Sequence, residues 1–117
     1  MEEKMHYNLS NLKNMVGDDP DVILEFINLF VDTSAQTLSD LNNAHNAKDY
    51  PTVGSLAHKL KSSVDLMGIE SLYDTIRIIE RSGKEQINIP SLPDHFSKLN
   101  DVLEIVYRQM KTDFNLK

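Results

Sequence analysis

The chain has 117 residues, which is enough for one domain with a single hydrophobic core. Its 18 acidic and 12 basic residues give a formal net charge of −6, and this excess of carboxylates argues against nucleic acid or an anionic membrane surface as a partner. Cysteine is absent, so disulfides, iron–sulfur clusters and cysteine-ligated zinc are excluded.

The sequence contains no recognisable targeting or membrane segment. Its first ten residues, MEEKMHYNLS, lack the apolar core of a secretory signal. No stretch approaches the roughly 18 apolar residues that a membrane-spanning helix needs. We therefore expect a soluble protein of the cytoplasm, or a cytoplasmic domain cut from a larger protein. We also expect a monomer.

The predicted fold opens with a lead-in and a short helix. Residues 1–7 are charged and lack a helical pattern, so we expect a flexible lead-in before a single folded domain over residues 8–117. Asn8 and Ser10 offer a helix cap, and Gly17 ends the helix. The apolar face of this helix consists of Leu12, Met15 and Val16.

A long helix is predicted from Pro20 to about Ala47, with Asp19 as its cap. One apolar stripe runs along it and consists of Ile23, Ile27, Phe30, Leu38 and Leu41. A second stripe is confined to the first half and consists of Val22, Phe26 and Leu29. A helix that is apolar on two sides needs two neighbours, so we expect the short first helix to cover the second stripe.

The next two predicted helices form a hairpin around Gly68. The first runs from about Tyr50 to Met67, and its apolar residues Val53, Leu56, Ala57, Leu60, Val64 and Met67 share one stripe. The second runs from Ile69 and is expected to end at Gly83. Gly54 lies inside the first helix, where glycine costs about 1 kcal/mol relative to alanine; it marks either close packing of a neighbouring helix or nothing in particular.

A loop over residues 84–90 leads to the last helix, which begins at Ser91 or Pro93 and continues to about Phe114. Four helices joined by short connections bury four apolar stripes most simply as an antiparallel bundle. The expected fold is therefore all-α: an antiparallel four-helix bundle with the short N-terminal helix capping one end.

One of the four histidines stands apart. At about 100° per residue, His58 lies roughly 140° from the centre of its helix's apolar stripe and faces solvent. His6 and His95 are interpreted as surface residues, and His45 as a half-buried structural side chain. No two histidines are four residues apart and no pair of helices carries Glu-x-x-His motifs, so no metal site is predicted. Nothing indicates the strained nucleophile or oxyanion site of a Ser–His–Asp enzyme.

The neighbours of His58 suit a phosphoryl acceptor. A neutral imidazole is a nucleophile at neutral pH, and phosphorylation adds roughly two negative charges. Lys61 and Ser62, one helical turn away, supply a positive charge and a small hydroxyl donor. In a hairpin about Gly68, Glu80 is offset from His58 by only about 3 Å along the helix axis, so its carboxylate is expected beside the ring, where it would fix the tautomer.

A family signature surrounds His58. The sequence reads Ala57-His58-Lys59-Leu60-Lys61-Ser62-Ser63, with Leu66 and Gly68 beyond it. This resembles the His-x-x-Lys-Gly-[Ser/Ala] pattern of histidine-containing phosphotransfer (HPt) domains. Residues 12–19 and the Leu-Phe pair at 29–30 are similar to the family's first two helices, and the likeness extends over about residues 8–114. Ser62 departs from the family's glycine, a difference that bears on docking geometry and not on the phosphoacceptor.

The resemblance implies a role for the chain and for its residues. His58 is the phosphorylated residue, Lys61 is the family's lysine, and Glu80 stands where many members have glutamine. The chain is then a phosphorelay intermediate that accepts a phosphoryl group from the phospho-aspartate of one receiver domain and passes it to another. The expected partners are response-regulator receivers and a hybrid sensor histidine kinase.

No nucleotide-binding motif is present in the sequence. We therefore expect no kinase activity and no cofactor of the chain's own, with Mg²⁺ bound by the partner receiver. A docking surface is expected around His58, with Leu66, about 80° from it, as its best exposed apolar residue. The other candidates for this surface are Lys59, Asp65, Ile23, Phe26 and Met15, while Arg77 and Lys84 are further candidates near the histidine.

Other interpretations stay open from the sequence. His58 and the lysines beside it can be an ordinary solvated helix face. The chain can be an HPt-like binding module that holds receivers without exchanging phosphate, although such a module needs neither His58 nor Lys61. It can also be the substrate domain of a chemotaxis-type kinase, or the tail of a hybrid sensor kinase rather than a free-standing protein.

Overall fold

The computed structural model describes residues 5–116, and all regular structure within them is helical. The predicted all-α class is confirmed. Short 3₁₀ turns over Glu70–Leu72 and Ile89–Ser91 precede the fourth and fifth α-helices. The α-helices found in the described part of the chain are α1 (Ser10–Val16), α2 (Pro20–Asn46), α3 (Tyr50–Leu66), α4 (Tyr73–Glu85) and α5 (Leu92–Asp113).

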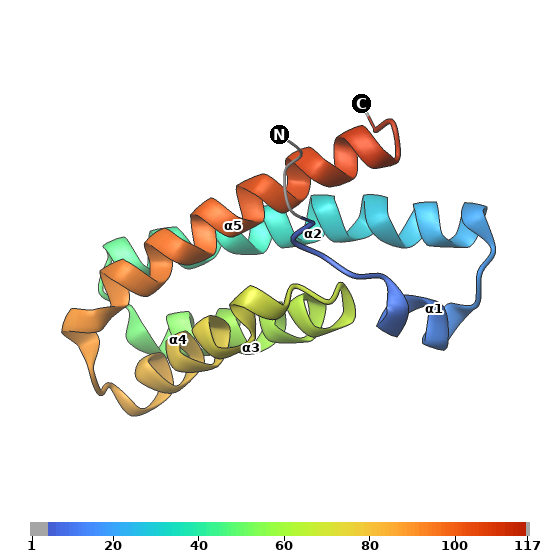
Figure 1. Cartoon of the computed structure of the whole chain (residues 1–117). Helices are drawn as coiled ribbons and strands as arrows, with labels where there is room; N and C mark the ends of the chain where they lie inside the picture. The colour runs from blue at the N-terminus through green and yellow to red at the C-terminus, as the bar shows by residue number, and fades with distance from the viewer. Residues whose placement is uncertain (1–4, 117) are drawn as a thin grey trace.

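The four longer helices surround one core. Helices α3 and α4 lie side by side as a hairpin, α2 packs against α3 and α5, and α5 packs against α4 (Figure 1). The short helix α1 contacts α2 and α3 near the start of α2. All five helices contribute fully buried side chains to this core; the largest include Leu12, Ile27, Leu41, Leu60, Ile76, Ile79, Leu99 and Leu103. No helix within residues 5–116 is long and apolar enough to cross a membrane.

Local sequence explains where the helices begin. The Asp19 carboxylate accepts a hydrogen bond from the backbone N–H of Asp21 at 3.0 Å, and a proline follows it in the first turn of α2. The Asp49 carboxylate accepts one from the backbone N–H of Thr52 at 3.3 Å and one from the Thr52 hydroxyl at 2.7 Å. Both caps satisfy N–H groups that have no partner inside the helix. The predicted starts of α2 and α3 are confirmed.

The second helix of the hairpin differs from its prediction at both ends. Regular α-helix begins at Tyr73, after the 3₁₀ turn, and continues through Gly83 to Glu85. The expectation that Gly83 ends this helix is wrong, because Gly83 is buried against α3 inside α4. The helix ends instead at Glu85, and Gln86 caps it in the left-handed conformation with φ of 53°.

The second apolar stripe of α2 is covered only in part. Leu29 is 59% exposed, so the expectation that α1 covers the whole stripe is wrong. In the first stripe Leu38 is half-buried, and Ser34 is buried in the core. Ser34 tolerates burial because its hydroxyl bonds the backbone carbonyl of Phe30 at 2.5 Å and the Tyr107 hydroxyl at 2.7 Å.

The predicted lead-in is anchored at its last residue. Tyr7 is buried, and its hydroxyl donates a hydrogen bond to the Asp113 carboxylate at 2.6 Å. The flexible segment predicted over residues 1–7 therefore does not include Tyr7, because the aromatic ring joins the core. Residues 1–4 lie outside the described part of the chain.

The turn between α3 and the following 3₁₀ segment depends on Gly68. Gly68 has a positive φ of 60°, and a Cβ atom at this position would collide with the backbone carbonyl oxygen of Asn8. The backbone N–H of Asn8 in turn donates to the carbonyl oxygen of Met67 at 3.0 Å. The N-terminal segment therefore closes directly over the turn of the hairpin.

Alanine substitutions at Gly68 and Gly17 distinguish the cost of backbone strain from the cost of the collision with Asn8. Gly17 also has a positive φ, of 88°, but open space surrounds the position of its Cβ. We predict that Gly17→Ala lowers the free energy of unfolding by about 1 kcal/mol, and Gly68→Ala by at least about 2 kcal/mol. Urea denaturation measures both losses, and equal losses would contradict the contact with Asn8.

Candidate functional site

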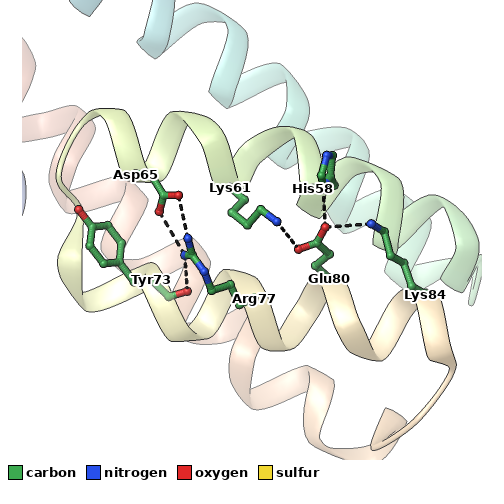
Figure 2. Close-up of polar contacts among 7 residues, drawn as sticks. All are labelled: His58, Lys61, Asp65, Tyr73, Arg77, Glu80 and Lys84. Atoms are coloured by element: carbon green, nitrogen blue, oxygen red, sulfur yellow. Dashed lines mark hydrogen bonds and ion pairs between the residues drawn. The ribbon is translucent and has the colours of Figure 1, made fainter. Parts of the chain in front are cut away.

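The exposed face of the hairpin gathers charged side chains from both of its helices. His58 and Lys61 project from α3, and Glu80 and Lys84 project from α4 toward them (Figure 2). His58 lies ten residues before Gly68 and Glu80 twelve after it, so the two helices bring them to nearly the same height. The expectation that Glu80 lies beside His58 is confirmed as geometry.

Glu80 is the centre of this cluster. Its Oε2 atom is 2.5 Å from His58 Nδ1 and accepts a hydrogen bond from Lys84 Nζ at 3.0 Å. Its Oε1 atom accepts a hydrogen bond from Lys61 Nζ at 2.8 Å. The Glu80 side chain is only 12% exposed, whereas the His58 side chain is 61% exposed. A nearly buried carboxylate therefore holds an imidazole that faces solvent.

The charge state of Glu80 decides the tautomer of His58. Burial by itself raises the pKa of Glu80, but hydrogen bonds from Lys61, Lys84 and His58 outweigh it and lower that pKa to about 2. At neutral pH the carboxylate is thus ionised and can only accept hydrogen bonds. The hydrogen bond between His58 and Glu80 therefore needs its proton on His58 Nδ1, while Nε2 has no partner among the described residues.

A second ion pair joins the two helices nearer the turn. Two guanidinium nitrogens of Arg77 donate to the two carboxylate oxygens of Asp65 at 2.8 and 3.1 Å, and one of them also donates to the Tyr73 carbonyl at 3.0 Å. The Asp65 hydrogen bonds raise the pKa of Arg77. Asp65 and Arg77 therefore pair with each other, and neither contacts His58.

The remaining candidates on α3 and α1 lie at the surface. Ser62 and Lys59 are exposed on α3, and the Ser62 hydroxyl has no hydrogen bond within residues 5–116. Met15 is 59% exposed on α1. Ile23 is buried, with 4% exposure, so its proposed part in docking is wrong: its side chain points into the core.

An apolar groove of about 150 Å³ lies between α2 and the end of α3. It includes two of the proposed docking residues, Phe26 and Leu66, which are half-buried. Leu29 also lines it and is its most exposed large apolar residue, although it is not among the docking candidates predicted from the sequence. The available signal is its helical spacing, which places it with Phe26 on the second apolar stripe of α2. The other lining residues are Phe30, Thr33, Ser63 and Met67.

The other histidines take no part in the cluster around Glu80. The His45 ring stacks on the Phe96 ring, with 4.1 Å between their centroids, and burial lowers its pKa. The interpretation of His45 as a structural side chain is confirmed. His6 and His95 are half-buried, so they are less exposed than predicted. Among the residues described, no group of three or more histidine, aspartate and glutamate side chains could hold a metal ion.

Comparison with known proteins identifies the family. A model of the Hpt domain matches residues 25–110, which is well over half of the chain and includes His58, Lys61 and Glu80. The chain therefore belongs to the Hpt domain family. Hpt domains are phosphocarriers rather than enzymes; they transfer phosphoryl groups in two-component phosphorelays and interact there with receiver domains. No curated protein and no solved structure matches the chain significantly.

The ionised Glu80 makes stability depend on pH. Because its pKa is lowered from 4.5 to about 2 on folding, its stabilisation is complete above about pH 4.5 and is lost as the pH falls toward 2. We predict that Glu80→Gln lowers the free energy of unfolding by roughly 1–3 kcal/mol at pH 7 and by much less at pH 2.5. Urea denaturation at pH 7, 4 and 2.5 measures this change.

Glu85→Gln is the matched control for this measurement. Glu85 lies on the same helix but is 53% exposed and forms a surface ion pair with Arg81, so its replacement should change stability little at any of these pH values. A loss in Glu80→Gln that stays constant from pH 7 to 2.5 would contradict the lowered pKa of Glu80.

Proposed function

We propose that this chain is a phosphorelay intermediate and that His58 is its phosphoacceptor. The proposal depends on one observation: Nδ1 of an exposed imidazole is held by an ionised, nearly buried carboxylate. This contact places the proton on Nδ1 and leaves the lone pair of Nε2 for nucleophilic attack. The donor is the phospho-aspartate of one receiver domain, and the acceptor is the aspartate of another.

In the forward step, Nε2 of His58 attacks the phosphorus atom of the receiver's phospho-aspartate. The P–O bond to the aspartate breaks, and the bonding electrons stay on the released carboxylate. Positive charge develops on the imidazole as the N–P bond forms, and Glu80 stabilises it through the proton on Nδ1. Lys61 and Lys84 bring two ammonium groups to the edge of the site, where they offset the negative charge of the phosphoryl group. Transfer to the second receiver reverses these steps.

The partner supplies what this chain lacks for phosphoryl transfer. We infer that Mg²⁺ and most of the transition-state stabilisation belong to the receiver domain, and that this chain has no cofactor, kinase activity or nucleotide site of its own. We further propose a monomer of the cytoplasm, with α2–α5 as an antiparallel four-helix bundle capped by α1, which receives its phosphoryl group in a pathway that begins at a hybrid sensor histidine kinase.

The receiver is proposed to dock over the groove beside His58. Leu29, Phe26 and Leu66 give this surface an apolar centre. Helix α2 contains no lysine or arginine, and it carries four acidic residues, Asp21, Glu25, Asp32 and Asp40. A receiver with an apolar centre and a basic edge would complement this surface. Ser62, exposed between His58 and Leu66, lies where the partner must approach the imidazole most closely.

Labelling with a phosphorylated receiver tests the phosphoacceptor. Incubation with a receiver carrying ³²P on its aspartate should label the wild-type chain and His95→Gln, and should leave His58→Gln unlabelled, because within residues 5–116 His58 is the one histidine whose Nδ1 proton is held by a carboxylate. The label should be stable to base and labile to acid, as expected of a phosphoramidate. Label on His58→Gln at the wild-type rate would contradict the assignment, and association without any labelling would favour the binding-module alternative.

Single alanine substitutions test the docking surface. Leu29→Ala should weaken binding of the receiver about five- to tenfold, corresponding to roughly 1 kcal/mol of lost apolar contact. Ile78→Ala is the control, because Ile78 is also exposed, at 39%, but lies on α4 outside the groove. Isothermal titration calorimetry measures both affinities. Equal effects of the two substitutions would remove Leu29 from the interface.

A further inference from the structure

Two of the four glycines lie inside helices rather than in turns. Gly17 and Gly68 have positive φ angles that favour glycine, but Gly54 in α3 and Gly83 in α4 have helical backbones that any residue adopts. Glycine is unfavourable inside a helix because it loses more conformational freedom on folding than alanine does. A reason for glycine at positions 54 and 83 must therefore come from packing.

Gly54 and Gly83 contact each other across the α3–α4 interface, and both are buried. A Cβ atom on Gly83 would lie 2.5 Å from the backbone nitrogen of Gly54 and 2.8 Å from the carbonyl oxygen of Tyr50. A Cβ atom on Gly54 would lie 2.9 Å from the backbone nitrogen of Lys84. Ordinary van der Waals contact begins at 3.4 Å. Backbone therefore lies directly on backbone at this crossing.

The crossing lies one helical turn from the contact between His58 and Glu80. Gly54 precedes His58 by four residues, and Gly83 follows Glu80 by three. The other end of the hairpin is joined by the bidentate ion pair near the turn. A side chain inserted at the glycines would therefore separate the two helices at the end that holds Glu80.

The separation of the helices decides what Glu80 can reach. Its carboxylate contacts two side chains of α3 at once, His58 at 2.5 Å and Lys61 at 2.8 Å. A methyl group on Gly83 would need its contact with α3 to widen from 2.5 Å to about 3.4 Å. The same widening added to either hydrogen bond would exceed the roughly 3.2 Å limit of a good one. The close contact between Gly54 and Gly83 therefore keeps the two helices near enough for Glu80 to hydrogen-bond both His58 and Lys61.

We propose that Gly54 and Gly83 are a positioning pair for phosphoryl transfer. Their backbone contact sets the spacing at which Glu80 holds the His58 ring with Nε2 toward the incoming receiver. The proposal rests on the proposed function of His58 as phosphoacceptor. The glycines themselves contact neither the phosphoryl group nor the partner, and they act through Glu80.

Two readouts test the pair in Gly83→Ala and Gly54→Ala. The first is the rate of phosphoryl transfer from a phosphorylated receiver, and the second is the ¹³C NMR titration midpoint of the Glu80 carboxylate. Gly83→Ala should slow transfer about ten- to a hundredfold and raise the Glu80 midpoint from about 2 toward 4.5. Gly54→Ala should change both in the same direction but less, because its closest backbone contact, at 2.9 Å, is longer than the 2.5 Å contact of Gly83.

Val106→Ala controls for a general loss of stability. Val106 is fully buried in α5, so this variant should unfold more easily while its folded form keeps the wild-type rate and Glu80 midpoint. A folded Gly83→Ala with both wild-type values would overturn the proposal. If Gly83→Ala does not fold, the same two readouts on Gly54→Ala decide. If the wild-type chain accepts no label, the proposed function fails, while the Glu80 midpoint, which needs no partner, still tests the spacing.

Discussion

The contact between His58 and a nearly buried carboxylate is the constraint on which the hairpin depends. An ionised carboxylate out of water is destabilising unless hydrogen bonds compensate for its lost hydration, and Glu80 obtains them from His58, Lys61 and Lys84. Two of these donors come from α3 and one from α4, so the compensation exists only while the two helices stay close and in register. The glycine crossing at one end and the ion pair near the turn at the other hold them in that arrangement.

The rest of the chain packs against the buried face of the α3–α4 hairpin and against its turn at Gly68. Helices α2 and α5 pack against α3 and α4, and they are joined to each other by paired side-chain amides of Asn42 and Asn100 at 2.9 and 3.0 Å. The N-terminal segment closes over Gly68. A side chain on a rigid helix keeps its orientation when a partner arrives, so the bundle contributes precision to a site whose imidazole lies on the exposed face of the hairpin.

The fixed rise of the α-helix explains how much of this could be predicted. Once Gly68 was recognised as a turn, residue counting alone placed Glu80 beside His58. Counting could not show that α4 continues through Gly83. Glycine is common both at helix ends and where two helices pack closely. These two roles are distinguished only by the backbone of the opposing helix, which the sequence does not reveal. The anchoring of Tyr7 on Asp113 spans nearly the whole chain, and helical periodicity carries no information about contacts of that kind.

A carboxylate at position 80 has a consequence that an amide at the same position would not have. An amide can donate as well as accept, whereas an ionised carboxylate only accepts, so Glu80 admits one tautomer of His58. Two ammonium groups and one carboxylate also leave the site with one net positive charge, which under the proposed function would attract an anionic phospho-aspartate. In the proposed transfer, the phosphoryl oxygens bring roughly two negative charges, while the imidazole that keeps its Nδ1 proton gains one positive charge, so the net charge of the site falls to about zero. The groups that orient the imidazole would therefore attract the donor before transfer and lose that attraction after it.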